Sequence, residues 1–223
     1  MINLEVYRKI LNSLEPYNAS LVAASKFKSK DDILELYHEG HRDFGENYVQ
    51  ELVQKQEELP KDIRWHFIGS LQRNKVKYIA PFIHLIHGVD SFRLYKEINK
   101  EGAKNNRVIP CLLQMHIAEE DTKSGLDERD MIEFFEYCEA QASELKNVRL
   151  KGVMGMATFT ENQEKVVSEF QQLKNHFHFI KDSYFIGDKE FKTISMGMSN
   201  DYELALEHGS NMVRIGSLIF GNR

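Results

Sequence analysis

The sequence predicts a closed (β/α)8 barrel of the TIM type, preceded by one extra helix. Short apolar runs alternate with stretches of helical periodicity about eight times along the 223 residues. No segment rich in Pro, Gly or Ser divides the chain, and its length suits one barrel-sized core. Such unbroken βα units favour a parallel sheet that closes on itself, so we expect residues 1–223 to form a single domain.

The first element is an amphipathic helix within residues 1–17. Leu4, Tyr7, Leu11 and Leu14 fall on one stripe at helical spacing, which predicts that they face the barrel. Charges are spread through this segment, which therefore lacks the apolar core of a signal peptide.

The strands are predicted from short apolar runs that lie between helical patterns. Their expected ranges are 20–24, 43–45, 64–68, 83–89, 108–117, 148–154, 193–195 and 212–215. An open, doubly wound sheet is the main competitor for the same alternation. That fold usually carries a Gly-rich turn after its first strand, whereas residues 25–28 here read Ser-Lys-Phe-Lys, so the closed barrel is preferred.

The helices that follow the strands are predicted from their spacing and their end signals. Their expected ranges are 31–39, 48–58, 74–80, 91–105, 128–143, 163–180 and 201–208. Gly40 and Gly209 stand at the usual stop positions, and Ser91 stands at a capping position.

The composition argues against several functional classes. The formal net charge is −5, so no global basic field exists to hold nucleic acid or an anionic membrane surface. No apolar run approaches the roughly 20 residues that cross a bilayer. Cys111 and Cys138 are expected to be reduced core thiols, which indicates the cytoplasm. The histidines are scattered, and no metal-ligand spacing, hydrolase elbow or nucleotide loop occurs, so no metal site is expected.

Reactive groups of such barrels lie at the carboxyl ends of the strands. Lys26 directly follows the first strand, where partial desolvation would lower its pKa from about 10.4 and favour attack on an aldehyde. A solvated lysine at a strand end is the simpler interpretation of its position. Lys28 adds positive potential nearby or simply faces water.

Two small-residue loops follow the last two strands, at residues 195–199 and 214–217. Loops at this place often bind phosphate, because glycine allows close backbone approach and helix N-termini present N–H groups. Gly216 and the hydroxyls of Ser199 and Ser217 would complete such a site. Alternatively, Ser199 is a plain helix cap and Gly216 a plain turn. Arg214 shares a strand face with Gly216 and is either an interior ion-pair partner or a ligand to whatever the phosphate anchors.

The remaining candidates have weaker signals. Asn47 follows the second strand and could cap a helix, and His66 competes with Trp65 for the inward side of its strand. Lys123 lies in a polar loop after the fifth strand, most simply a solvated turn. Met154 is expected to face inward, where it could pack against a ring.

Several segments resemble one known family in the same order along the chain. SLVAASKFK, FGENYVQE, WHFIGSLQRNK, SMGMSNDYELA and GSNMVRIGSLIFG resemble signatures of the pyridoxal phosphate homeostasis proteins, the YggS/PROSC family. The resemblance extends from about residue 20 to the end of the chain. Phe27 stands where threonine is common and Ser70 where proline is common, and neither departure touches the lysine or the phosphate loops.

The resemblance implies a barrel of the type found in the amino-terminal domain of alanine racemase, called fold type III among proteins that bind pyridoxal 5′-phosphate (PLP). It implies PLP held as an aldimine on Lys26, with its phosphate at Ser199, Gly216 and Ser217. It also places Arg214 by the pyridine nitrogen and Asn47 beside the ring. Family members act in vitamin B6 homeostasis without an established reaction.

Three functions therefore compete: a PLP carrier or regulator, an amino-acid racemase or decarboxylase, and a cofactor-free Schiff-base aldolase. Related racemases carry a second, β-rich domain with an opposing base. The chain ends at Arg223, eight residues after the last expected strand, so we expect no such domain here. An arginine at the ring nitrogen also weakens the ring as an electron sink. We expect a carrier rather than an enzyme, a cytoplasmic monomer whose partners are PLP and recipient apoenzymes.

Overall fold

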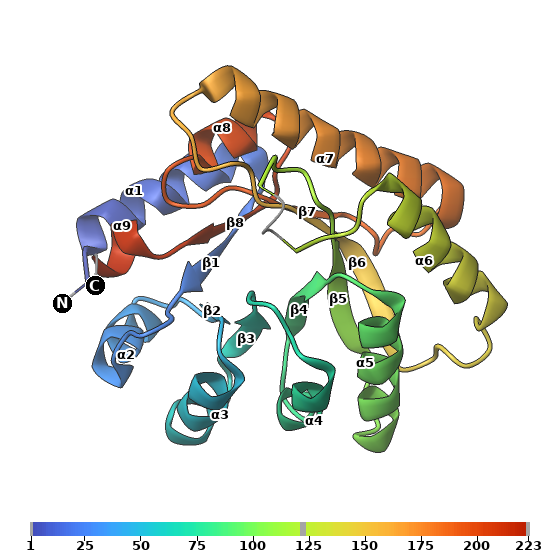
Figure 1. The fold of residues 1–223 in the computed structure, drawn as a ribbon. Helices are drawn as coiled ribbons and strands as arrows, with labels where there is room; N and C mark the ends of the chain where they lie inside the picture. Colours follow the sequence, from blue (N-terminus) through green and yellow to red (C-terminus); the bar gives the residue numbers. More distant parts are fainter. Residues whose placement is uncertain (1, 121–123, 222–223) are drawn as a thin grey trace.

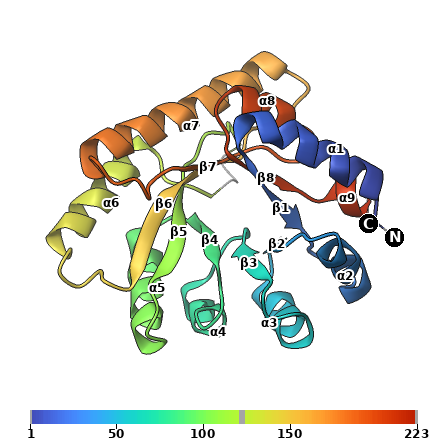
Figure 2. The same cartoon turned by 180° about the vertical axis from the view of Figure 1, so that it is seen from behind.

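A computed structural model describes residues 2–120 and 124–221, which form a closed barrel of eight parallel strands in the order β1 to β8. Helices surround the barrel, as Figures 1 and 2 show from opposite sides. The strands are β1 Ser20–Ala24, β2 Asp43–Glu46, β3 Arg64–Phe67, β4 Leu85–Val89, β5 Ile109–Gln114, β6 Val148–Met154, β7 Thr193–Ser195 and β8 Met212–Ile215. The closed barrel predicted from the sequence is confirmed, and the open sheet is wrong.

The helices lie on the outside of the barrel. They are α1 Leu4–Leu14, α2 Lys30–His38, α3 Val49–Glu58, α4 Val76–Ile79, α5 Phe92–Lys104, α6 Glu128–Ala140, α7 Gln163–Tyr184, α8 Tyr202–Glu207 and α9 Ser217–Phe220, with 3-10 turns at Glu15–Tyr17 and Arg73–Lys75. Most expected helices are present within a few residues of their predicted ends. The α9 helix was not predicted, because four residues are too short to show a helical period.

The inner face of α1 differs from the predicted stripe by one residue. Tyr7, Ile10 and Leu14 are buried, whereas Leu11 is 38% exposed. The α1 helix packs against α9 and β1, and the Asn3 N–H donates to the Ile219 carbonyl. The contact with α9 selects the buried side, and the sequence could not reveal this contact because it did not predict α9.

The buried apolar side chains form two clusters that differ in size. Most buried apolar side chains lie in one large cluster that includes the outward faces of the strands and the inner faces of the helices. A small cluster of Leu85, Leu112 and Met154 comes from β4, β5 and β6. Cys111 is buried and Cys138 half-buried, and both are free thiols, as expected. Within the described ranges, no helix combines the length and apolar character needed to cross a bilayer.

Candidate cofactor-binding site

The ends of β1, β7 and β8 open into a cleft of about 1670 Å³. Five of the seven residues predicted to bind a cofactor line this cleft: Lys26, Ser199, Arg214, Gly216 and Ser217. These residues come from three loops that are far apart in sequence. Closure of the barrel brings them together, because β1 pairs with β8 and β7 pairs with β8.

Lys26 stands in a tight turn directly after β1. The next residue, Phe27, adopts a left-handed conformation with φ of 61°, and its N–H donates to Glu51 Oε1 at 2.6 Å. This bond fixes the turn that presents Lys26 to the cleft. The Lys26 side chain is exposed, so the expectation that its amine is partly desolvated is wrong for this structure.

The other two lysines near this turn are held by protein groups. Lys28 Nζ donates to the carbonyls of Phe220 and Gly221, which ties the turn to the end of α9. Lys55 is buried, and its amine donates to carboxylates of Glu46 and Glu51. All three donors of this amine are engaged, since it also donates to the Ser25 carbonyl, so it is not available to a ligand.

The loop after β7 depends on one glycine. Gly197 has φ of 93°, and a Cβ there would lie 2.6 Å from the Ala205 Cβ in α8. Only glycine accommodates both the left-handed backbone and this close approach. The Gly197 carbonyl accepts a hydrogen bond from the Arg214 N–H at 3.0 Å, so the loop is fastened to β8.

The loop after β8 is equally confined. A Cβ on Gly216 would lie 2.8 Å from the Ala24 carbonyl oxygen, so this position also requires glycine. The Gly216 N–H donates to Ser199 Oγ at 3.4 Å, which joins the two loops. Gly216 caps α9, whose first N–H groups, beginning at Ser217, have no acceptor within the helix. Small side chains and available N–H groups are what a bound phosphate needs.

Arg214 is buried, and its guanidinium donates to two neutral acceptors. Its Nη1 donates to Ser195 Oγ at 2.7 Å, and its Nη2 donates to the Gly155 carbonyl at 3.1 Å. Burial lowers the pKa of Arg214 to about 10, so the guanidinium stays charged at neutral pH. Of the two alternatives left open by the sequence, an ion pair is not what these hydrogen bonds show, since they go to a hydroxyl and a carbonyl. A buried cation whose hydrogen-bond acceptors are a hydroxyl and a carbonyl favours a further acceptor at the cleft.

Asn47 and Met154 are the two predicted residues absent from the described lining of the cleft. Asn47 is half-buried at the end of β2, and its Oδ1 is buried without a hydrogen-bond partner. Met154 is 1% exposed and packs in the small cluster with Leu85. The inward orientation expected for Met154 is consistent with this packing. The unpaired Asn47 oxygen is a feature that sequence patterns could not indicate.

His66 and Lys123 were weaker candidates. His66 is 2% exposed, and its Nδ1 lies 3.0 Å from His87 Nε2 on the neighbouring strand, so it faces the barrel interior. Trp65 belongs to the large cluster instead. Lys123 lies outside the described residues. His87 and Ser195 were not predicted as interior residues, although their inward positions follow the same alternation of side chains along a strand.

Comparison with known proteins identifies the family of this chain. The model of the alanine racemase N-terminal domain family matches residues 3–223. A pyridoxal phosphate homeostasis protein of Aquifex aeolicus is 40% identical over 206 residues, covering 92% of this chain and 87% of that protein. The Escherichia coli protein of the same name is 35% identical, covering 93% of this chain and 87% of its own length.

Solved structures give the same result. PipY of Synechococcus elongatus, determined with PLP bound, is 30% identical with a TM-score of 0.85, covering 97% of this chain and 99% of PipY. Alanine racemase of Bartonella henselae shares the fold at 15% identity with a TM-score of 0.69, covering 95% of this chain and 56% of the racemase chain. The extent of the family model and the identity to these relatives establish that this chain belongs to the pyridoxal phosphate homeostasis protein family.

Proposed function

We propose that this chain binds PLP on Lys26 and acts as a carrier or regulator of intracellular PLP rather than as an enzyme. One observation carries the proposal: an exposed lysine, two confined glycine loops and a buried guanidinium line the same cleft. PLP offers an aldehyde, a phosphate and a pyridine ring, so each of these features has a chemical partner on one small molecule. The names of the relatives and the PLP-bound PipY support the same choice.

The residues of the cleft fit PLP in three ways. Lys26 would bind the aldehyde carbon through its amine, because it is the exposed lysine at the end of β1. Gly216 leaves room for a phosphate beside the start of α9, where the hydroxyls of Ser199 and Ser217 would add hydrogen bonds. The unpaired Asn47 oxygen and the Met154 side chain are proposed to lie beside the ring.

Arg214 would donate a hydrogen bond to the pyridine nitrogen. A guanidinium cannot give up a proton to that nitrogen at neutral pH, since even after burial its pKa is about 10. Bound PLP supplies an electron sink for amino-acid chemistry, and an unprotonated ring makes that sink weak. A weak electron sink favours a carrier over a racemase or decarboxylase.

The biological role proposed here is to hold a reactive aldehyde and supply it to PLP-dependent apoenzymes. We infer a cytoplasmic protein that acts as a monomer and as a single domain, with no nucleic-acid or membrane partner. The net charge of −5 supports the exclusion of anionic polymers.

Absorbance spectroscopy of the purified protein tests the proposal. A visible chromophore that borohydride bleaches, with a reduced adduct on Lys26 by mass spectrometry, is the expected result. The alternative enzyme function is tested by incubating the PLP-loaded protein with amino acids in deuterated water. Rapid α-proton exchange would support a racemase or decarboxylase, and a protein with no chromophore would contradict PLP binding.

A further inference from the structure

A line of four hydrogen bonds crosses the barrel interior and ends on Arg214. Asp43 Oδ1 lies 3.0 Å from His66 Nε2, and His66 Nδ1 lies 3.0 Å from His87 Nε2. His87 Nδ1 lies 3.3 Å from Ser195 Oγ, which accepts from Arg214 Nη1 at 2.7 Å. These residues come from β2, β3, β4, β7 and β8, so the line joins strands from both sides of the barrel.

One arrangement of protons gives each of the four hydrogen bonds along this line one donor and one acceptor. Asp43 is ionised, because bonds to Arg64 and His66 hold its pKa well below the usual range despite partial burial. Its oxygen therefore accepts from the His66 Nε2–H, which leaves His66 Nδ1 as an acceptor. His87 must then donate through Nε2 and accept at Nδ1 from the Ser195 hydroxyl.

The same arrangement of protons determines which neighbour the Ser195 hydroxyl donates to and which one it accepts from. Its hydroxyl hydrogen points to His87, so its oxygen is free to accept from the Arg214 guanidinium. His87 is fully buried, and this burial, with the nearby His66 and Arg214, places its pKa well below the usual range. His87 therefore remains neutral, and the hydrogen bonds along the line place the Nε2 proton of each ring toward its neighbour.

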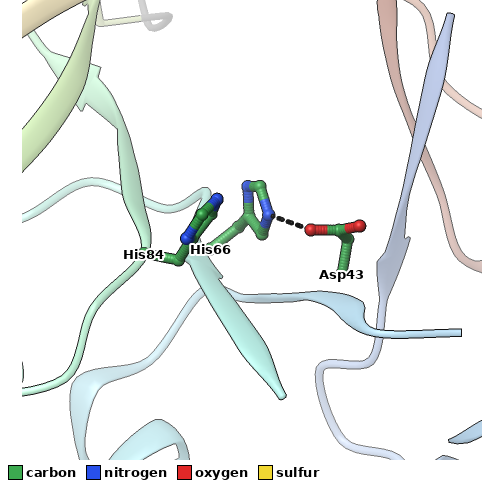
Figure 3. Close-up of side chains that lie close together, drawn as sticks. All are labelled: Asp43, His66 and His84. Atoms are coloured by element: carbon green, nitrogen blue, oxygen red, sulfur yellow. Dashed lines mark hydrogen bonds and ion pairs between the residues drawn. The ribbon is translucent and has the colours of Figure 1, made fainter. Parts of the chain in front are cut away.

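The outer end of the line also contains a candidate metal site, found in a search of residues 2–120 and 124–221. Asp43, His66 and His84 each offer a ligand atom, and these atoms lie within 4.8 Å of one another (Figure 3). The existing bonds argue against a metal ion. Both Asp43 oxygens accept from Arg64, at 2.7 and 2.5 Å, and both ring nitrogens of His66 are engaged. A metal ion would have to displace a guanidinium and break the line.

We propose that Asp43, His66, His87 and Ser195 are positioning residues for Arg214. They orient the N–H donors of its guanidinium and hold the group in place at the cleft. Ser195 and the Gly155 carbonyl each take one of its five N–H donors, which leaves other donors directed by a rigid frame. The inference rests on the proposed function, because its consequence is the orientation of Arg214 toward the ring nitrogen of PLP.

Long-range ¹H–¹⁵N correlation spectra of the histidine rings in the PLP-free protein test the line directly. We expect His66 and His87 to carry their protons on Nε2 at pH 7, with Nδ1 unprotonated. In Asp43→Asn the side-chain amide can donate to His66 instead, so the tautomers of His66 and His87 should change together. A charged His87, an Nδ1–H tautomer of either histidine in the wild type, or an unchanged His87 in Asp43→Asn would overturn the proposal.

A second measurement tests the effect on bound PLP. Ser195→Ala should shift the pH profile of the PLP absorbance band and weaken PLP binding about tenfold, since the guanidinium loses an oriented acceptor. Ser210→Ala is the matched control: Ser210 is also buried, and its hydroxyl donates to the Met196 carbonyl rather than contacting Arg214. Equal behaviour of the two variants would refute the positioning role.

The two measurements separate this inference from the proposed function. A wild type with no chromophore would refute PLP binding and with it the positioning role, whatever the tautomers. If the wild type carries a chromophore on Lys26 but His66 or His87 has its proton on Nδ1, the positioning role is refuted and PLP binding is not. The expected tautomers together with a shifted profile in Ser195→Ala would support both.

Discussion

The mouth of the barrel and its interior satisfy their polar groups in different ways. At the mouth, Lys26 and Ser217 are exposed and Ser199 is half-buried, on loops joined by a few backbone bonds. In the interior, His87 and Ser195 are fully buried and each bonds to a side chain of a neighbouring residue in the line. Exposed groups can change partners at little cost to folding, whereas buried polar groups must keep theirs. We therefore expect mouth variants to lose binding and interior variants to lose stability as well.

The largest expected effect is at the mouth. Lys26→Ala should abolish the covalent PLP adduct while the thermal unfolding midpoint stays close to that of the wild type, because the side chain is exposed. Mass spectrometry after borohydride reduction measures the adduct. Lys28→Ala is the matched control, since Lys28 binds carbonyls of the chain and should not be needed for the adduct. A dominant adduct on Lys28 or Lys123 in the wild type would contradict the assignment.

The hydroxyls of the two loops should contribute the next largest effect. Ser199→Ala and Ser217→Ala each remove one hydrogen bond to a charged phosphate, a loss of about 1.5–3 kcal/mol, or about 10- to 150-fold in affinity. Main-chain N–H groups should remain in place, so the fold should persist. Titration with PLP measures the loss of affinity. Unchanged affinity in the double variant would show that the phosphate binds elsewhere.

Arg214 lies between the two regions, so its variants should affect both the chemistry of bound PLP and the stability of the fold. Arg214→Glu offers an acceptor to the ring nitrogen and should increase α-proton exchange of amino acids by the PLP-loaded protein. Because the new carboxylate would face the Gly155 carbonyl, we also expect a lower unfolding midpoint. Arg214→Gln is the control, since its uncharged amide can still donate to Ser195. Exchange that is no faster in Arg214→Glu than in Arg214→Gln would contradict the electronic role.

The smallest effect concerns the pH dependence of stability. The folded pKa of His87 lies below its unfolded value, mainly because burial disfavours the charged ring. The unfolded state therefore binds the proton first, and stability is lost as pH falls below about 6.5, by at most about 1.4 kcal/mol per pH unit for this residue. Burial lowers the pKa of His41 and His176 in the same sense.

Urea unfolding at pH 7.5, 6.5 and 5.5 measures this loss. His87→Asn should reduce the slope between pH 6.5 and 5.5, because it removes one proton-binding group from the unfolded state. Asp43 should contribute at lower pH only, since the stability from its lowered pKa is present above about 3.9 and lost below it. An equal slope in wild type and His87→Asn would show that His87 is charged in the folded protein.

Local sequence patterns predicted most of the fold. The runs at 20–24, 148–154, 193–195 and 212–215 match β1, β6, β7 and β8 at both ends, because an apolar run between helical patterns is a local signal. The run at 108–117 was too long. The β5 strand ends at Gln114, where the chain folds back so that the His116 N–H donates to the Leu126 carbonyl. Such a return depends on contacts that no local period contains.

Local patterns were enough to predict the parallel barrel, the place of Lys26 after β1 and the two glycine loops, because strand ends and glycine positions are properties of short segments. No local pattern could indicate that Lys26 is exposed, that Arg214 donates to Ser195 or that His66 contacts His87. Each of these depends on the register of strands distant in sequence, which closure of the whole barrel sets. Alternation along a strand assigns a side chain to a face, whereas the neighbour it meets there is chosen by the adjoining strand.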